Sequence, residues 1–176
     1  ILLSIKWHPK GICSTYLCTL KKGDTISARI EKNVKFHFPK QASSVWLIAN
    51  GTGIAPYLGM LNEHHKTPVQ LTWGGRIETS FDCYRVFLEN KLLRKQVITY
   101  QLALSQTEEK MYVQDVLLDQ QAEVSKTLKN GGVFMLCGSM AMQHAVLDTL
   151  EEITRTNLQQ PLSDFENNGQ LLVDCY

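Results

Sequence analysis

A short glycine segment follows an apolar stretch and has the residues to bind a phosphate. Residues 45–50 are mostly apolar and predict a buried strand, and Gly51, Thr52 and Gly53 follow directly. Pro56 suits the first turn of a helix. Glycines lack a β-carbon, so a phosphate can approach main-chain amides there, and the threonine hydroxyl could cap the helix or donate to the ligand. An ordinary glycine turn with a threonine cap would show the same residues.

The cysteines and histidines do not predict a metal centre. Cys13 and Cys18 have the spacing that begins a plant-type iron–sulfur motif, but no third close cysteine follows. His64 and His65 are adjacent, so on a helix they point to different sides and fit two surface histidines better than a zinc site. Five cysteines without a repeated spacing favour free thiols in a reducing compartment, and we expect a cytoplasmic protein.

Length and charge narrow the class of protein further. A chain of 176 residues can bury one core, or one domain with a piece of another. Its 18 Lys and Arg residues nearly balance 17 Asp and Glu residues, so we expect no nucleic-acid partner and no membrane contact from this segment. The longest apolar runs are far too short to span a bilayer, and the first residues lack the pattern of a signal peptide.

The elements that must position the glycine segment alternate between strand and helix. Apolar patterns predict strands at 45–50, 68–73, 97–104, 133–137 and 170–174, with helices at 54–65, 79–94, within 113–129, 140–155 and 161–167. This alternation predicts an α/β fold with a doubly wound, five-stranded parallel sheet. Ligands of such sheets gather at the carboxyl ends of the strands, where the strand order reverses.

The first 40 residues have a different character. Alternation over residues 1–7 predicts a half-buried strand with Leu3, Ile5 and Trp7 on one face. A turn and a short helix are expected within 11–20, and residues 25–38 carry further β-like segments. Residues 41–44 are a small polar linker. We therefore expect a domain boundary near residue 41, with a β-rich part at 1–40 and an α/β domain at 41–176.

Five motifs in one order resemble the ferredoxin–NADP reductase family. They are Gly11 to Leu17, Gly51 to Pro56, Ser105 to Gln114, Cys137-Gly138 and the terminal Asp174-Cys175-Tyr176. Each motif is weak alone, but the five occur in the same order as in the family and at compatible spacing. Together they cover essentially the whole chain. The terminal motif is most similar to the diflavin branch, which includes the flavoprotein subunit of sulfite reductase. The resemblance implies that 41–176 is the NADP-binding module and that 1–40 is the C-terminal remnant of the FAD-binding β-barrel domain.

The resemblance assigns the first motif to FAD. Gly11, Ile12, Cys13 and Ser14 are similar to the turn and helix that bind the FAD diphosphate, although a plain capped helix would show the same residues. The family's Arg-x-Tyr-Ser segment, which holds the flavin, does not occur in this sequence. We therefore expect a fragment cut within the flavin domain, whose isolated chain binds FAD weakly.

The segment from Ser105 to Gln114 is similar to the one that recognises the 2′-phosphate of NADPH. A phosphate dianion needs hydrogen-bond donors and positive charge. Gln106 stands where relatives that prefer NADPH usually carry arginine, so a contact worth roughly 1.5–3 kcal/mol is missing. We expect NADPH as the nucleotide, with NADH as the alternative. A solvated polar loop would have a similar composition. The residues implied are Ser105, Gln106, Lys110, Tyr112 and Gln114, with Arg76 near the adenine or diphosphate.

The last two motifs are similar to the hydride-transfer site of the family. The resemblance places Cys137 beside the nicotinamide, without a covalent role, and Gly138 allows the flat ring to approach. A buried structural thiol is the alternative interpretation of Cys137. Asp174 is implied to orient the cysteine and stabilise the cationic nicotinamide, and Tyr176 to cover the flavin ring until the nicotinamide displaces it. Ser139 replaces an acidic residue that relatives often carry and is expected to cap the following helix.

The resemblance thus implies an oxidoreductase module that transfers hydride from NADPH to FAD. Electrons would then pass singly to a flavodoxin-like FMN domain or to another one-electron carrier. The alternative is a regulatory or assembly module that holds NAD(P) without redox activity.

Overall fold

A five-stranded parallel sheet forms the centre of the molecule in a computed structural model, which describes residues 3–31, 33–63 and 66–176. The strand order is β3-β2-β1-β4-β5, so the order reverses between β1 and β4. The predicted fold, a doubly wound α/β sheet of five parallel strands, is confirmed. The strands are β1 (Val45–Asn50), β2 (Val69–Gly75), β3 (Thr99–Leu104), β4 (Val133–Gly138) and β5 (Leu171–Cys175).

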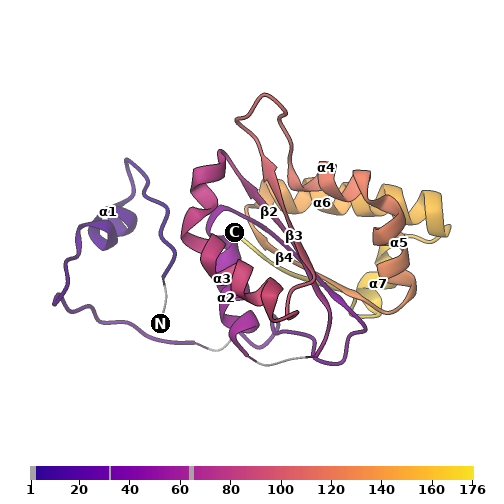
Figure 1. Ribbon diagram of the computed structural model, residues 1–176, viewed down its shortest axis with the longest axis horizontal. Helices are drawn as coiled ribbons and strands as arrows, with labels where there is room; N and C mark the ends of the chain where they lie inside the picture. The colour runs from indigo at the N-terminus through magenta and orange to yellow at the C-terminus, as the bar shows by residue number, and fades with distance from the viewer. Residues whose placement is uncertain (1–2, 32, 64–65) are drawn as a thin grey trace.

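Helices cover both faces of this sheet (Figure 1). On one face lie α2 (Ala55–Asn62) and α3 (Asp82–Leu93). On the other lie α4 (Val113–Asp119), α5 (Gln121–Lys129), α6 (Met140–Ile153) and α7 (Leu162–Asn167). Short 3-10 turns, Gly51–Ile54 and Glu78–Phe81, precede α2 and α3, and a π turn, Thr154–Leu158, extends α6. The predicted helices at 54–65 and 79–94 are correspondingly shorter, and His64 and His65 lie outside the described residues.

The central strand β1 supplies both halves of the core. Alternate side chains of a strand point to opposite faces, so Val45, Leu47 and Ala49 pack toward α2 and α3. Trp46 and Ile48 pack toward the other helices. The Trp46 ring stacks on Phe134 of β4 at 5.4 Å between centroids. Burial on both faces explains why this strand is apolar almost throughout.

Local sequence signals begin and end the helices that border the site. Pro56 lies in the first turn of α2, where its missing amide hydrogen costs no hydrogen bond. Ser139 precedes α6, and its hydroxyl accepts a hydrogen bond from the Met142 amide at 3.3 Å, which confirms the predicted cap. Gly131, with φ +74°, follows the last turn of α5.

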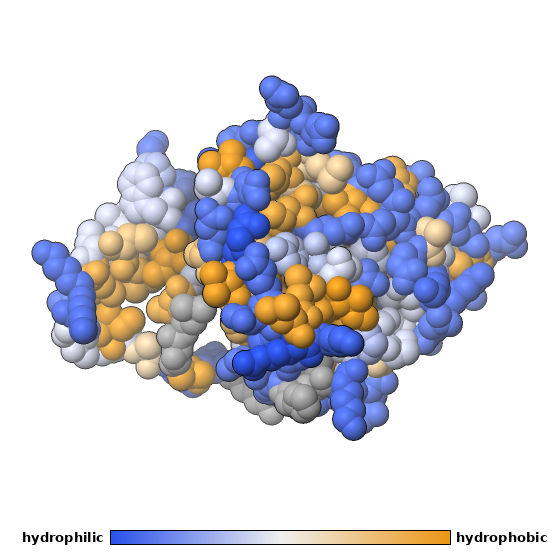
Figure 2. Space-filling model, in the orientation of Figure 1, coloured by the Kyte–Doolittle hydropathy of each residue, from blue (hydrophilic) through white to orange (hydrophobic). Residues whose placement is uncertain are grey.

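The first 40 residues form a loose segment beside the sheet. Within the described residues 3–31 and 33–40 the only helix is α1 (Ile12–Thr19), and no strand forms there. The strands predicted at 1–7 and 25–38 are therefore wrong there, because a strand needs a neighbour in a ladder and no ladder forms in the described part of this segment. Leu3 and Trp7 are more than half exposed. Figure 1 shows this segment on the left, and Figure 2 shows hydrophobic side chains on the surface of that region.

One part of this region nevertheless belongs to the core of the sheet. Phe36 is only 4% exposed and packs with the helices α2 and α3. Its ring centroid lies 6.1 Å from that of Tyr57, which is fully buried in α2. The packed unit therefore includes a residue that precedes the linker at 41–44.

Candidate functional site

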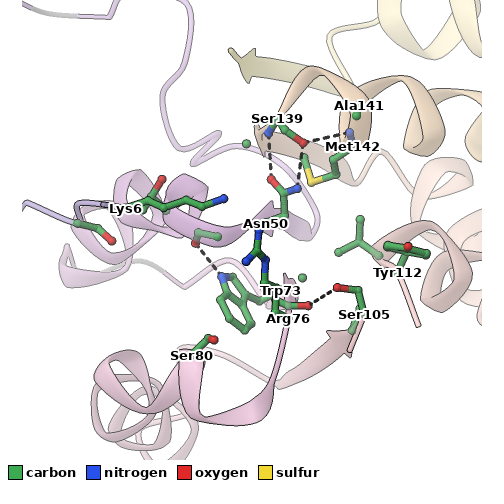
Figure 3. Close-up of a pocket in the computed structure, with 18 of the residues that line it drawn as sticks. Lys6, Asn50, Trp73, Arg76, Ser80, Ser105, Tyr112, Ser139, Ala141 and Met142 are labelled. Atoms are coloured by element: carbon green, nitrogen blue, oxygen red, sulfur yellow. Dashed lines mark hydrogen bonds between the residues drawn. The ribbon is translucent and has the colours of Figure 1, made fainter. Parts of the chain in front are cut away.

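A cavity of about 990 Å³ lies at the carboxyl ends of β1, β2, β3 and β4. Its position matches the place where ligands bind in doubly wound sheets. Figure 3 shows polar side chains that converge on it from several elements, including Asn50, Arg76, Ser105 and Ser139. Residues 3–6 of the N-terminal segment form a further wall, and the Ser4 hydroxyl lies 2.5 Å from the Tyr84 hydroxyl.

The glycine loop after β1 is built for close packing. Gly51 has a φ of +54°, which favours glycine. A β-carbon at Gly53 would lie 2.1 Å from the carbonyl oxygen of Cys137, so this residue must be glycine for β1 and β4 to end side by side. Trp73 Nε1 donates to the Gly51 carbonyl oxygen at 2.9 Å and holds the loop from the β2 side. The loop therefore borders the cavity in a fixed conformation.

Thr52 has a different partner from the one that the sequence suggests. Its side chain does not cap the helix. Its hydroxyl instead lies 3.1 Å from the hydroxyl of Tyr176 at the opposite end of the sequence. Both residues line the cavity, so the terminal tyrosine stands directly over the glycine loop.

Cys137 is 2% exposed and, like Asp174, does not line the cavity, although its main chain packs against Gly53 of the glycine loop. It pairs in register with Asp174 of β5, so the two side chains are neighbours on one face of the sheet. Burial, followed by the negative charge of Asp174 and by Cys175, raises the pKa of the Cys137 thiol to about 12. The thiol is therefore protonated at physiological pH.

The chain beyond Cys137 leads back to the glycine loop. The Tyr176 amide donates to the Gly138 carbonyl oxygen at 2.9 Å, and Gly138 borders the cavity. On the other side, Asn33 Nδ2 donates to Asp174 Oδ2 at 3.2 Å, which links the N-terminal segment to β5. The structure thus brings Thr52, Cys137 and Tyr176 to one edge of the sheet.

Most of the residues predicted in the segment from Ser105 to Gln114 lie at the end of the cavity opposite Tyr176. Arg76, Ser105, Tyr112 and Gln114 line it. Arg76 is exposed and forms no ion pair with any residue that the structure describes. The Ser105 hydroxyl donates to the Gly75 carbonyl oxygen at 3.2 Å.

Gln106 and Lys110 do not line the cavity, although both belong to the same loop. Lys110 Nζ lies 5.0 Å from the centroid of the Tyr112 ring, at the border of the cavity. Interaction with the Tyr112 side chain raises the pKa of this ammonium group, so Lys110 is positively charged. The Gln106 amide donates to the Arg76 carbonyl oxygen at 2.8 Å, which joins this loop to the end of β2.

The first motif is separate from the cavity. Gly11, Ile12, Cys13 and Ser14 lie at the start of α1, and none of them lines the cavity. The Ser14 hydroxyl accepts from the His8 amide at 3.2 Å and donates to the Gly11 carbonyl oxygen at 3.3 Å. Main-chain amides at the start of α1 are therefore the groups that this motif can offer to a ligand.

Sequence reasoning missed several residues of the cavity wall, above all Asn50. This residue ends β1, and its side chain makes two hydrogen bonds to Ser139. A polar residue that ends a buried strand directly before a glycine loop was the available signal, but its partner lies 89 residues away.

No cluster of metal-ligating side chains occurs among the described residues 3–31, 33–63 and 66–176. Within the same residues, no helix has the length and apolar composition needed to cross a membrane.

Comparison with known proteins agrees with this geometry. Residues 47–148 match the family described as the oxidoreductase NAD-binding domain. The chain is 31% identical to NADPH–cytochrome P450 reductase of Dictyostelium discoideum, over 94% of this chain and 27% of that protein. It is 29% identical to the sulfite reductase [NADPH] flavoprotein alpha-component of Bacillus subtilis (strain 168), over 95% and 30% respectively. It is 30% identical to the embryo isozyme of chloroplastic ferredoxin–NADP reductase of Oryza sativa subsp. japonica, over 95% and 49%.

This chain spans less than half the length of each of these relatives. The matches cover the glycine loop, the loop after β3 and the end of β4. They confirm the resemblance that the order of the five motifs indicates. The chain therefore belongs to the ferredoxin–NADP reductase family and contains its oxidoreductase NAD-binding domain.

Proposed function

We propose that this chain is the nucleotide-binding part of an NADPH-dependent flavoprotein reductase, in which hydride passes from NADPH to FAD. One observation carries the proposal: Thr52 of the glycine loop and the terminal Tyr176 meet at one edge of the cavity, and the main chain of the buried Cys137 packs directly against Gly53 of the same loop. The opposite end carries Arg76 and Tyr112. A dinucleotide with a phosphorylated adenosine has matching chemistry at its two ends.

The residues around the cavity fit this nucleotide. Its volume of about 990 Å³ is at the upper end of the range of ligand pockets. Lys110, at the border of the cavity, supplies positive charge for a 2′-phosphate, and Arg76 supplies it near the adenine or diphosphate. Tyr112 supplies an aromatic face for adenine. We assign the diphosphate to main-chain amides of the glycine loop, two of whose residues, Gly51 and Thr52, line the cavity.

The protonation state of Cys137 supports a role in positioning. With a pKa of about 12 the thiol is neutral, so it is a poor nucleophile and acts by packing beside the nicotinamide. Asp174 lies next to it on the sheet and can stabilise the positive charge that the nicotinamide gains when hydride leaves.

Tyr176 controls access to this edge. One face of a ring cannot stack on Tyr176 and on the nicotinamide at the same time, so we propose that the tyrosine moves when nucleotide binds. Its contact with Thr52 is a single exposed hydrogen bond, and such bonds contribute only about 0.5–1.5 kcal/mol. The residue can therefore move at little energetic cost.

We propose that residues 1–40 belong to the FAD domain of a longer protein and that 41–176 form the NAD(P) domain. When bound, FAD accepts a hydride and releases electrons one at a time. The described residues offer it only the amides of α1 and the Tyr176 ring, so most of its site must lie outside this sequence. Ile12, Ile30 and Val34 are at least 73% exposed, which supports a missing covering partner.

The proposed acceptor of the single electrons is a flavodoxin-like FMN domain or another one-electron carrier. The similarity to NADPH–cytochrome P450 reductase and to the sulfite reductase [NADPH] flavoprotein alpha-component supports this assignment. Three exposed and unpaired thiols, Cys13, Cys18 and Cys83, support a reducing compartment, and we place the protein in the cytoplasm.

Turnover by the full-length parent protein, loaded with FAD, tests the enzyme assignment. In the wild type, NADPH should reduce ferricyanide. Cys137→Ala or Asp174→Ala should lower kcat on the order of 100-fold, because misplacing the reacting groups by about 1 Å has an effect of that size. Cys18→Ala, in the exposed helix α1, is the matched control and should retain activity. Intact NADPH binding without turnover in the wild type would instead favour the regulatory or assembly module.

The 2′-phosphate end of the proposed site has its own test. Gln106→Arg should add a charge-assisted contact of roughly 1.5–3 kcal/mol and tighten NADP+ binding about 10- to 100-fold relative to NAD+. Isothermal titration of the 176-residue chain measures both affinities. Gln120→Arg, at the C-terminal end of α4 and outside the cavity lining, controls for the added charge. If Gln106→Arg produces no preference for NADP+, the phosphate lies elsewhere.

A further inference from the structure

Two side chains from distant parts of the sequence are joined at the edge of the cavity. Asn50 ends β1, and Ser139 precedes α6. The Ser139 amide donates to Asn50 Oδ1 at 2.9 Å, and Asn50 Nδ2 donates to Ser139 Oγ at 3.0 Å. Both residues are half-buried and line the cavity, where Figure 3 shows them side by side.

The main chain determines which way the Asn50 amide points. A backbone N–H can only donate, so the side-chain atom that faces the Ser139 amide must be the oxygen. The NH₂ group must then face Ser139 Oγ. This orientation follows from hydrogen-bond polarity, and the reverse orientation would place two donors against each other.

The same reasoning determines where the Ser139 hydroxyl hydrogen can go. A hydroxyl accepts two hydrogen bonds and donates one. Ser139 Oγ accepts from Asn50 Nδ2 and from the Met142 amide at 3.3 Å, and both partners are obligate donors. Its own hydrogen therefore remains available, and within the described part of the chain Ser139 Oγ donates no hydrogen bond.

We propose that Ser139 donates this hydrogen bond to the bound nucleotide and that Asn50 is the positioning residue that directs it. The inference rests on the proposed function, since it names a further contact of the same site. Ser139 follows Cys137-Gly138 at the end of β4, whereas Tyr112 follows β3, and β2 and β1 lie between these two strands in the sheet. The acceptor is therefore an oxygen on the nicotinamide side of the nucleotide, either in its ribose or in the phosphate attached to that ribose.

Three nucleotide probes of increasing length identify the acceptor in titrations of the 176-residue chain. Adenosine 2′,5′-bisphosphate contains neither group, adenosine 2′-phosphate 5′-diphosphate adds the second phosphate, and 2′-phospho-ADP-ribose adds the ribose. Ser139→Ala should leave the affinity for the shortest probe unchanged. It should weaken binding roughly 3- to 10-fold for the first probe that contains the acceptor and for any longer probe. A loss of this size is the effect of one neutral hydrogen bond.

Two further variants separate donation from the structural cap. Ser139→Thr keeps the hydroxyl and should retain most of the affinity. If Ser139→Ala acted only by removing the helix cap, it would instead affect the binding of all three probes equally. Ser43→Ala removes a serine from the exposed linker and is the matched control. Thermal unfolding of each variant verifies that the chain remains folded.

Asn50→Asp tests the positioning role. The introduced carboxylate still accepts from the Ser139 amide but cannot donate to Ser139 Oγ, so the hydroxyl turns its hydrogen toward that carboxylate and away from the ligand. Binding of the longest probe should fall by more than in Ser139→Ala, because the added charge also repels phosphate. In the Ser139→Ala background the same substitution should cost less, since only the repulsion remains.

The outcomes separate the two proposals. If the wild type binds none of the probes, the proposed function fails and this contact fails with it. If the wild type binds them all and Ser139→Ala binds each with wild-type affinity, the inference is overturned while the function stands. Equal effects of Asn50→Asp in both backgrounds would overturn the positioning role of Asn50.

Discussion

The sheet and the N-terminal segment use similar apolar residues with opposite results. In the sheet, Ile48 and Phe134 are fully buried between two layers of helices. In the segment, Ile12 is 91% exposed and Ile30 is 79% exposed. Helix α1 buries none of its residues. Apolar composition therefore does not decide burial by itself; it does so only where neighbouring elements can cover the side chain.

This contrast assigns different tasks to the two regions. The sheet region packs its own core and holds nearly all of the cavity wall. The segment contributes residues 3–6 to that wall and Phe36 to the core. Its contacts with the sheet region include the hydrogen bonds of Ser4 to Tyr84 and of Asn33 to Asp174, and Lys40 forms an ion pair with Glu63. We infer that the sheet region folds by itself and that the segment gains its structure from contacts outside this chain.

The largest expected difference between the regions comes from a pair of truncations of apolar side chains. Phe134→Ala removes a ring that stacks on Trp46, and it should lower the free energy of unfolding by about 3–5 kcal/mol. Ile12→Ala, its matched partner in α1, should change it by less than about 0.5 kcal/mol. Urea denaturation of both variants measures the difference. Comparable losses would mean that the segment is packed in solution.

A pair of glycine substitutions tests how tightly the sheet region holds the loop. Gly53→Ala forces a β-carbon against the main chain of Cys137, where no flexible side chain can yield, and should destabilise the chain by about 3 kcal/mol. Gly59→Ala, in the exposed part of α2, meets no atom within 4 Å and should stabilise by about 0.5–1 kcal/mol. Thermal unfolding should therefore shift in opposite directions; a shift in the same direction would contradict the packing at Gly53.

Two shortened chains locate the border between the regions. A chain that starts at residue 35 keeps Phe36 and should have nearly the stability of all 176 residues. A chain that starts at residue 41 loses this buried ring and should be less stable by about 1.5–3 kcal/mol. Guanidinium denaturation compares the two proteins. Equal stability of both would show that Phe36 is not part of the core.

The smallest expected effect is the pH dependence from the buried thiol over the single pH unit between about pH 9 and 10. Because the pKa of Cys137 is about 12 in the folded chain and ordinarily near 9.0, the folded state keeps its proton after the unfolded state has lost it. Stability should therefore be fully present below about pH 9 and fall as the pH rises toward about 12, by up to roughly 1.4 kcal/mol per pH unit.

The control for this effect comes from the other region. Cys137→Ala should show a shallower fall in unfolding free energy between about pH 9 and 10, whereas Cys18→Ala, in exposed α1, should keep the wild-type slope. Subtracting the pH slope of one variant from that of the other also removes the contribution of Tyr57. Burial raises the pKa of this tyrosine well above its usual value in both variants. Identical slopes for Cys137→Ala and the wild type would contradict the raised pKa.

Sequence patterns predicted the sheet region well because its signals are local. The bounds of β1 were predicted correctly, since a strand buried on both faces must be apolar along its length. Pro56 and Ser139 likewise act within one helical turn of their own positions. The strands predicted in the N-terminal segment failed because alternation shows a tendency only, and a strand also needs a partner.

The candidate site was predictable in its parts but not in its connections. Glycines, a cysteine and a terminal tyrosine could be recognised from their order along the chain. The bond between Thr52 and Tyr176 joins residues 124 positions apart, and the pair of Asn50 and Ser139 spans 89. Hydrogen bonds over such separations depend on strand order, which local patterns do not contain.

The sequence by itself determined the alternation of strands and helices and the position of the glycine loop after β1, because each depends on residues close together in the chain. Only the tertiary structure decided which strands adjoin β1, how deeply Cys137 is buried and where the Ser139 hydroxyl can donate. Those properties depend on distances between segments far apart in the chain, and packing of the whole sheet sets them.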